Sequence, residues 1–147
     1  MKAIFLLAFF ITFQGSYGCD NGWISFNGHC YHFSTDLESW IGAEGVCIHF
    51  GSYLAEIDDH AEDMFMQNWV NILAKVFWVG GTDLGFEGDW TWAYSKKHLY
   101  NGYTRWQRNE PSNSGGSEHC LNLWRYTDWN DWPCWQVTNF ICEKNGP

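Results

Sequence analysis

Residues 110–134 read Glu-Pro-Ser-Asn-Ser-Gly-Gly-Ser-Glu-His-Cys-Leu-Asn-Leu-Trp-Arg-Tyr-Thr-Asp-Trp-Asn-Asp-Trp-Pro-Cys. Two short clusters in this stretch, residues 110–113 with Glu118 and residues 129–131, concentrate oxygen-bearing side chains. Together they offer three carboxylates, amide oxygens and a hydroxyl. Calcium takes about six to eight oxygen ligands, whereas zinc and copper favour histidine and thiolate ligands. The stretch therefore predicts a calcium site.

The proline of the first cluster bears on how this site forms. A cis peptide bond costs little before proline and much before any other residue. A cis bond between Glu110 and Pro111 would reverse the chain and direct the side chains of Glu110 and Ser112 at one ion. A cis bond at this position would therefore serve an ion site at little cost.

Six cysteines all follow residue 18, and they are Cys19, Cys30, Cys47, Cys120, Cys134 and Cys142. An even number of cysteines indicates disulfides when the domain is exported, as the N-terminal segment described next predicts. The sequence alone leaves their pairing open. A bridge between Cys120 and Cys134 would close a short loop and hold both oxygen-rich clusters on one surface. One between Cys19 and Cys30 would tie a local hairpin.

The N-terminal segment is typical of a secretory signal peptide. Lys2 supplies the positive start, residues 4–13 form an apolar run, and small residues precede the expected cleavage after Gly18. The run is too short to span a bilayer, which needs about 20 residues, and no later run is longer. We therefore expect residues 1–18 to be a signal peptide and residues 19–147 to form a secreted, extracellular domain with no membrane span.

The composition indicates one acidic domain that is rich in aromatic residues. The chain has 147 residues, which suits one domain, and its 8 Lys or Arg residues against 17 Asp or Glu residues give a net charge of −9. Because no basic run occurs, nucleic acid and anionic membranes are poor partners on electrostatic grounds. Aromatic residues make up 20% of the chain, more than a core requires, which indicates stacking surfaces as well.

Local patterns predict an α+β domain. Asn27-Gly28 is a preferred hairpin turn between strands within residues 23–33. Apolar spacing predicts helices over residues 37–50 and 59–73, and Asp59 with Glu62 is similar to a capping box at the start of the second. Short strands are expected at residues 77–80, 90–92, 121–124 and 139–142. Residues 94–118 form a long polar stretch, which in so small a domain is usually functional.

Across residues 19–147 the chain resembles a C-type lectin-like domain. Residues 129–131 match the family's Trp-Asn-Asp motif, residues 110–112 are similar to its Glu-Pro-Asn motif, and residues 77–81 resemble its Trp-Ile-Gly-Leu strand. The six cysteines match the long form of the domain. The resemblance implies an α+β fold with two helices, small antiparallel sheets, a long calcium-binding loop and three disulfides. The implied pairs are Cys19–Cys30, Cys47–Cys142 and Cys120–Cys134.

The resemblance also implies the site residues. The expected calcium ligands are Glu110, Ser112, Glu118, Asn130 and Asp131, with Asp131 adding its backbone oxygen. In the family, two sugar hydroxyls bind the same ion and hydrogen-bond to the same side chains. The expected carbohydrate-binding residues are therefore these five together with Trp132. The tryptophan of the Trp-Asn-Asp motif, Trp129, is expected to pack into the core.

An auxiliary calcium site is implied at Asp83, Glu87 and Asn113, with Glu118 shared between both ions. The match is incomplete, because Asn113 and His119 stand where the family prefers carboxylates. The simpler interpretation is that Asp83 and Glu87 belong to a solvated turn.

Ser112 departs from the family's asparagine. Its single oxygen would have to serve both the metal and the sugar, so we expect weaker calcium binding, weaker sugar binding, or both. Glu110 keeps the acceptor of mannose-type family members, and this slightly favours mannose-type sugars. Trp132 follows Asp131 directly and is a candidate platform for the apolar face of a galactose-type ring.

The resemblance therefore implies a secreted, calcium-dependent lectin that recognises terminal sugars on microbial or cell surfaces, in innate immune recognition or agglutination. A homo-oligomer would have to form through the domain itself. The alternative is a lectin-fold protein that binds mineral, ice or another protein. An enzyme is not expected, because Glu110 and Glu118, the best candidate carboxylate pair for a glycosidase, are already assigned to the cation.

Overall fold

The computed structural model describes residues 18–147, so the predicted signal peptide, residues 1–18, lies outside them except for Gly18. None of the helices in residues 18–147 has the length and hydropathy of a membrane-spanning segment. The helices are α1 (Trp40–His49), α2 (His60–Leu73) and two short 3-10 helices, η1 (Leu99–Asn101) and η2 (Ser114–Gly116). The strands are β1 (Ile24–Phe26), β2 (His29–Phe33), β3 (Tyr53–Leu54), β4 (Phe77–Thr82), β5 (Thr91–Trp92), β6 (Cys120–Leu123), β7 (Trp129–Trp132) and β8 (Asn139–Asn145).

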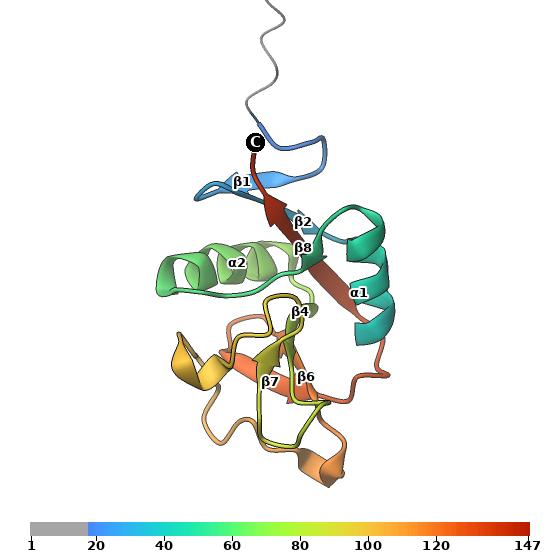
Figure 1. The fold of residues 1–147 in the computed structure, drawn as a ribbon, viewed down its shortest axis with the longest axis vertical. Coiled ribbons are helices and arrows are strands. Elements are labelled where there is room, and N and C mark those ends of the chain that lie inside the picture. Colours follow the sequence, from blue (N-terminus) through green and yellow to red (C-terminus); the bar gives the residue numbers. More distant parts are fainter. Residues whose placement is uncertain (1–17) are drawn as a thin grey trace, which may run out of the picture.

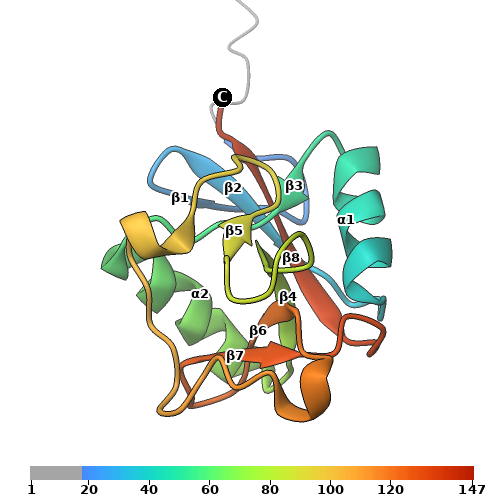
Figure 2. The same cartoon turned by 60° about the horizontal axis from the view of Figure 1, so that its bottom comes forward.

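The strands form one hydrogen-bonded network in the order β1-β2-β8-β4-β6-β7, with β3 beside β8 and β5 beside β4. All pairs are antiparallel except β4 with β8, which run parallel. The small antiparallel sheets that were expected are therefore joined. The reason is the length of β8: its first residues pair with β4 and its later ones with β2 and β3. In both views α1 and α2 lie on opposite sides of the strands (Figures 1 and 2).

Helix α1 begins three residues later than the apolar spacing predicts. Its N-cap is Ser39, whose hydroxyl accepts a hydrogen bond from Gly42 N. The preceding Glu38 is outside the helix because it exchanges two backbone hydrogen bonds with Thr138, at 2.9 and 3.0 Å. The C-terminal end agrees with the sequence: Gly51, which follows the C-cap, has φ +66°, a conformation that glycine adopts without strain.

Helix α2 begins where the sequence predicts. The Asp59 side chain accepts a hydrogen bond from Glu62 N at 2.9 Å. The return contact differs from a capping box, because Glu62 Oε2 accepts from Asp58 N, at 2.7 Å, instead of from the N-cap residue. The other oxygen of Glu62 accepts from the hydroxyl of Tyr31. This second contact ties the start of α2 to β2.

Two buried apolar clusters form the core, one against α2 and one against α1. Trp129 is fully buried in the first of them, as predicted. Its indole nitrogen donates to Asp63 of α2 at 2.8 Å, and Asp63 also accepts from Arg105 at 3.0 Å. A buried indole needs such a partner. This contact holds β7, and with it the Trp-Asn-Asp segment, in a fixed position against α2.

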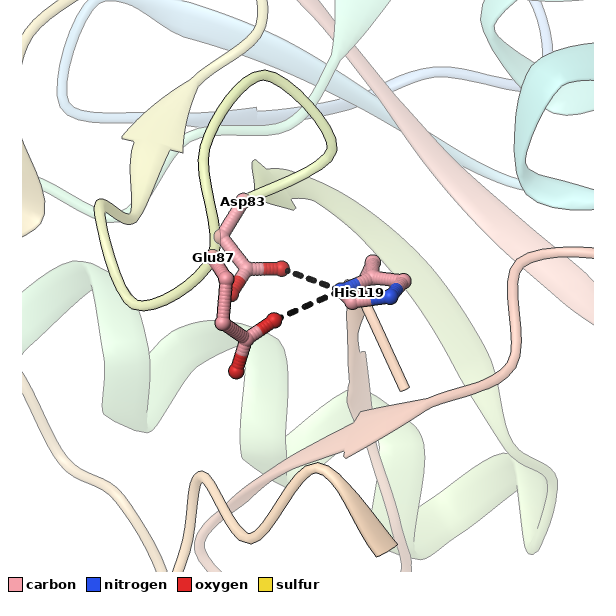
Figure 3. A group of neighbouring side chains, drawn as sticks. All are labelled: Asp83, Glu87 and His119. Atoms are coloured by element: carbon pink, nitrogen blue, oxygen red, sulfur yellow. Dashed lines mark hydrogen bonds and ion pairs between the residues drawn. The ribbon is translucent and has the colours of Figure 1, made fainter. Parts of the chain in front are cut away.

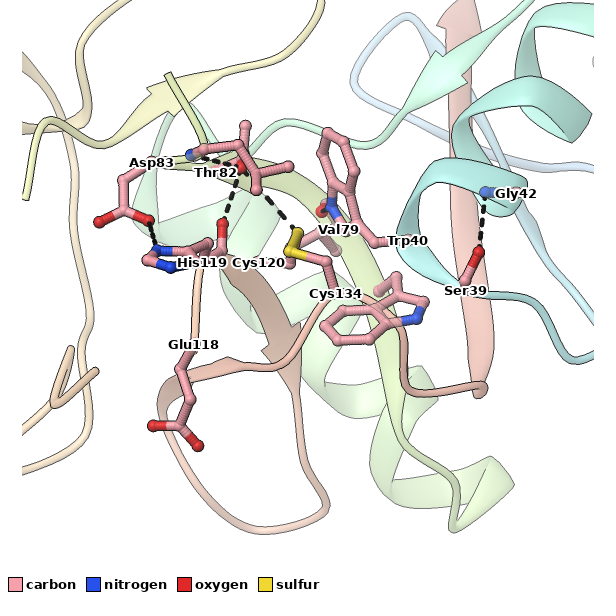
Figure 4. The surroundings of a disulfide bond; sticks show 12 residues. Ser39, Trp40, Gly42, Val79, Thr82, Asp83, Glu118, His119, Cys120 and Cys134 are labelled. Atoms are coloured by element: carbon pink, nitrogen blue, oxygen red, sulfur yellow. Dashed lines mark hydrogen bonds and ion pairs between the residues drawn. A yellow bond between two sulfur atoms is a disulfide. The ribbon is translucent and has the colours of Figure 1, made fainter. Parts of the chain in front are cut away.

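The three disulfides pair as the resemblance implied: Cys19–Cys30, Cys47–Cys142 and Cys120–Cys134. The second joins α1 to β8. The third connects the start of β6 to the segment after β7, next to Trp40 (Figure 4). The backbone N of Trp40 donates to the carbonyl oxygen of Cys134. This bridge holds together the two chain segments that carry the oxygen-rich clusters.

A buried acidic group lies at the other end of the molecule. Glu143, on β8, is only 3% exposed, and its carboxylate accepts hydrogen bonds from Glu56 N at 3.0 Å and from the Tyr53 hydroxyl at 2.9 Å. His29 Nδ1 lies 2.5 Å from the same carboxylate. Burial raises the pKa of Glu143 from 4.5 to about 7, although its hydrogen-bond partners and His29 oppose the increase.

This group makes stability depend on pH. The pKa of Glu143 is higher in the folded protein than in the unfolded chain. Its contribution to the free energy of unfolding is therefore fully present below about pH 4.5 and is lost as the pH rises through about 7. The loss is of order 3 kcal/mol of unfolding free energy at pH 8. Glu143→Gln should therefore be more stable than the wild type at pH 8, with a smaller difference at pH 5, in urea unfolding followed by tryptophan fluorescence. Equal effects at both pH values would contradict this assignment.

Candidate functional site

Ser112 is the residue around which the predicted ligands gather. Its backbone nitrogen donates to Glu110 Oε2 at 2.9 Å and to Asp131 Oδ1 at 3.1 Å. Its hydroxyl donates to Glu118 Oε2 at 3.2 Å. All three carboxylates that the sequence predicted are thus brought to one small surface. Asp131 belongs to β7, and β6 and β7 lie at the end of the molecule opposite the C-terminus (Figure 1). We call Glu110, Ser112, Glu118, Asn130 and Asp131 the Ser112 cluster.

Local structure explains the positions of these side chains. Asp131 lies on β7, where alternate residues are buried, and is 1% exposed. Its second oxygen accepts a hydrogen bond from Asn113 N at 2.7 Å. The loop between η1 and β6 is therefore fastened to β7 through backbone N–H groups. The peptide bond between Glu110 and Pro111 in this loop is cis, the form that the sequence analysis considered for an ion site.

The electrostatics of the cluster favour a bound cation. Burial raises the pKa of Glu110, and the neighbouring Asp131 raises it further. Among residues 18–147, no Lys, Arg or His side chain forms an ion pair with Glu110, Glu118 or Asp131. Three neighbouring carboxylates that lack a counter-ion in the described part of the chain offer only oxygen donors, and such a set suits a hard divalent ion such as calcium.

Asn130 and Asn122, which face each other on β7 and β6, give a second test of that fit. Asn130 Nδ2 donates to the backbone oxygen of Asp131 at 2.6 Å and to Asn122 Oδ1 at 3.4 Å, while the fully buried Nδ2 of Asn122 has no hydrogen-bond partner among residues 18–147. A half-turn of both amides would let Asn122 donate to Asn130, and would bring the amide oxygen of Asn130 beside the Asp131 carbonyl. Two such oxygens repel each other unless a cation lies between them. In that arrangement the cluster would present to calcium the oxygen ligands that it prefers.

Trp132, the candidate sugar platform, is half-buried. Side chains alternate along a strand, so its indole lies on the face of β7 opposite the Asp131 carboxylate. There it packs against Trp78 and Trp124, with ring centroids 5.6 and 5.9 Å away. Most of this side chain thus extends the core cluster beside α1.

The auxiliary residues are only partly brought together (Figure 3). His119 Nδ1 lies 2.9 Å from Asp83 Oδ1 and 3.2 Å from Glu87 Oε2. Asn113 instead caps its own loop, where its side-chain oxygen accepts a hydrogen bond from Glu118 N at 3.0 Å. The side-chain hydrogen bonds of Glu118 are likewise to the loop, to Ser112 and Ser114.

Sequence reasoning missed two residues with a place in this region. Asn122 was assigned to a strand but given no role. Residues two apart on a strand point to the same face, so Asn122 belongs on the same face as Cys120. His119 was noted only as a departure from the family pattern, and its contact with two acidic side chains depends on the folded loop. Strand β7 was not predicted either, because Trp-Asn-Asp-Trp does not alternate apolar and polar residues: the buried positions are Trp129 and Asp131.

Comparison with known proteins gives consistent matches. The family model described as "Lectin C-type domain" matches residues 36–144. A curated relative is Perlucin from Haliotis laevigata, which is 39% identical over 132 residues, covering 86% of this chain and 83% of the relative.

Solved structures match over a similar range. The carbohydrate-recognition domain of the mouse scavenger receptor C-type lectin has a TM-score of 0.81 and 29% identity, covering 88% of this chain and 98% of that chain. Herring type II antifreeze protein has a TM-score of 0.77 and 28% identity, covering 88% of this chain and 100% of that chain. The same fold thus occurs in a carbohydrate-recognition domain and in an antifreeze protein.

Proposed function

The chain belongs to the C-type lectin domain family, and from this premise we propose that it is a secreted, calcium-dependent lectin that binds terminal sugars at the Ser112 cluster. One observation carries the proposal: three carboxylates meet around Ser112, and no basic side chain of residues 18–147 pairs with them.

The proposed calcium ligands are Glu110, Ser112, Glu118, Asn130 and Asp131. When bound, calcium supplies coordination positions for neighbouring sugar hydroxyls. The carboxylates of Glu110 and Glu118 accept hydrogen bonds from those hydroxyls, and the amide of Asn130 donates one. Asp131, which is buried and bonded to two backbone N–H groups, holds the loop in register. We expect binding without turnover, since these groups serve the ion and the sugar.

The class of sugar follows from individual residues. Glu110 supports mannose-type sugars slightly over galactose-type sugars. The packing of Trp132 against Trp78 and Trp124 leaves the galactose-type alternative with less support. A single exposed site binds a monosaccharide weakly, so agglutination or immune recognition of microbial surfaces would require several copies, as in a homo-oligomer.

A glycan array probed with the mature chain tests the proposal. We expect binding to mannose-type glycans in millimolar calcium, loss of signal with a calcium chelator, and recovery when excess calcium is restored. Magnesium should not substitute, because it requires a smaller, regular octahedral site. Binding that persists in chelator, or no glycan binding at all, would overturn the proposal.

Ser112→Asn should strengthen binding. Asparagine presents a carbonyl oxygen and an N–H group from one planar amide, so it can serve the ion and a hydroxyl together. One additional hydrogen bond of this kind corresponds to about five- to tenfold in affinity. Competition by free mannose on a mannose column measures the change. Ser112→Ala is the matched control and should weaken retention; unchanged retention in both variants would show that residue 112 makes no contact.

The second candidate function is binding of ice, mineral or another protein. The likeness to herring type II antifreeze protein and the net charge of −9 favour it. Thermal hysteresis or calcium carbonate binding, with a blank glycan array, would select this alternative.

A further inference from the structure

A second group of ligand-type side chains lies beside the Ser112 cluster and is separate from it. Asp83, Glu87 and His119 each offer one potential ligand atom, and these three atoms lie within 4.8 Å of one another. Both carboxylates point at the same imidazole nitrogen (Figure 3). We propose that this group, called here the His119 group, binds a transition-metal ion of the zinc type in preference to calcium.

The positions of two of these ligands are fixed by separate contacts. Asp83 is 3% exposed, and its Oδ2 accepts a hydrogen bond from Gly88 N at 2.7 Å, which leaves Oδ1 directed at His119. The backbone oxygen of His119 accepts from the Thr82 hydroxyl at 2.7 Å and from Asp83 N at 3.2 Å. His119 also precedes Cys120 of the disulfide (Figure 4). The two segments are thus joined without help from a metal.

The distances suit a small ion. Zinc binds imidazole nitrogen and carboxylate oxygen at about 2.0–2.2 Å in a tetrahedron, so its ligand atoms are roughly 3.3 Å apart. The imidazole nitrogen lies 2.9 Å from Asp83 Oδ1 and 3.2 Å from Glu87 Oε2. Small shifts of these three side chains would make room for the ion, with a water molecule as the fourth ligand.

The donor types decide between metals. Calcium takes hard oxygen ligands, whereas imidazole is a usual ligand of zinc, cobalt, nickel and copper. His119 therefore moves the preference of this group from calcium toward zinc. An imidazole nitrogen binds a metal through its lone pair, so a proton on Nδ1 must move to Nε2 or leave when the ion binds. Glu87 is exposed enough to close on the ion.

The experiment titrates the chelator-treated mature chain with Zn²⁺ and with Ca²⁺ in a calorimeter. We expect one zinc site that survives Asp131→Asn, since the Asp131 carboxylate bonds to Ser112 and Asn113 and to none of the three proposed zinc ligands. Zinc affinity should fall roughly tenfold or more in Glu87→Gln and in His119→Asp. Removing a residue that only hydrogen-bonds to a metal ligand already costs about tenfold, and removing the ligand itself should cost at least as much. His119→Asp should gain calcium affinity, since it makes the donors all oxygen.

His60→Ala is the matched control, because His60 is an exposed histidine on α2 outside the group. It should leave zinc binding unchanged. Co²⁺ gives a second readout: the visible absorption of a tetrahedral nitrogen and oxygen site should appear in the wild type and disappear in Glu87→Gln, which is on the surface and should fold normally. Equal zinc isotherms for wild type, Glu87→Gln and His119→Asp would overturn the proposal and leave His119 as an ion-pair partner. Loss of zinc binding in His60→Ala would also overturn it.

Discussion

Replacing Asp131 by asparagine should abolish calcium binding and, with it, retention on a sugar column. The Asp131 carboxylate is 1% exposed and accepts backbone hydrogen bonds from Ser112 and Asn113. Asparagine keeps the size but removes the charge and one acceptor, so the ligand and the loop are weakened together. Extracellular calcium modules have dissociation constants of about 10⁻⁴–10⁻³ M, so a loss of about a hundredfold ends measurable binding. Calorimetry with Ca²⁺ measures it.

Asp128→Asn is the control for this variant. Asp128 lies three residues earlier, outside the Ser112 cluster, and pairs with Arg105 at 2.6 Å on the surface. Exposed ion pairs contribute little, so calcium affinity should stay within about twofold of the wild type. Near-UV circular dichroism should show that both variants keep their tertiary packing. Calcium isotherms that coincide for wild type and Asp131→Asn would remove Asp131 from the ligand set.

The second large effect concerns stability. Changing Cys47 and Cys142 to alanine together should lower the free energy of unfolding by about 4–5 kcal/mol, because their bridge closes 95 residue steps. Both side chains are fully buried between α1 and β8. A loss of this size is a large part of the stability of a small domain. Urea unfolding under non-reducing conditions measures it.

Alanine at both Cys19 and Cys30 is the comparison. That bridge closes only 11 steps, which the same loop-entropy relation converts to about 3 kcal/mol. The two double variants should therefore differ by more than about 1 kcal/mol. Where the Cys47 and Cys142 variant stays folded, its calcium affinity should persist, because the bridge at Cys120 that supports the site is intact. Equal destabilisation would mean that loop length does not govern the effect.

Local sequence patterns predicted elements whose stabilising contacts are near in the chain. The hairpin around Asn27-Gly28 and the start of α2 at Asp59 both formed as expected, because a two-residue turn and a capping side chain act within a few residues. The start of α1 was wrong because Glu38 bonds to Thr138, about a hundred residues away. No local pattern contains that partner.

The strands show the same division. The segment from Phe77 was predicted as a strand and extends to Thr82, where it pairs with β5 and β6. Its parallel pairing with β8 was not predicted, since it depends on the last strand of the chain lying in the middle of the network. The expected strand at residues 121–124 shifted by one, to Cys120–Leu123, because β7 sets its register.

By itself, the sequence determined which donor atoms this protein offers: carboxylates and amides in the segments around Ser112 and Asp131, and cysteines enough for three bridges. Residue types carry that chemistry whatever the fold, and the family resemblance added the expected pairing. Only the tertiary structure decided which donors meet. It brought Glu110, Glu118 and Asp131 to Ser112, turned Trp132 to the other face of β7, and placed His119 between Asp83 and Glu87. The physical reason is that strand register and loop closure, which depend on distant partners, set the direction of each side chain.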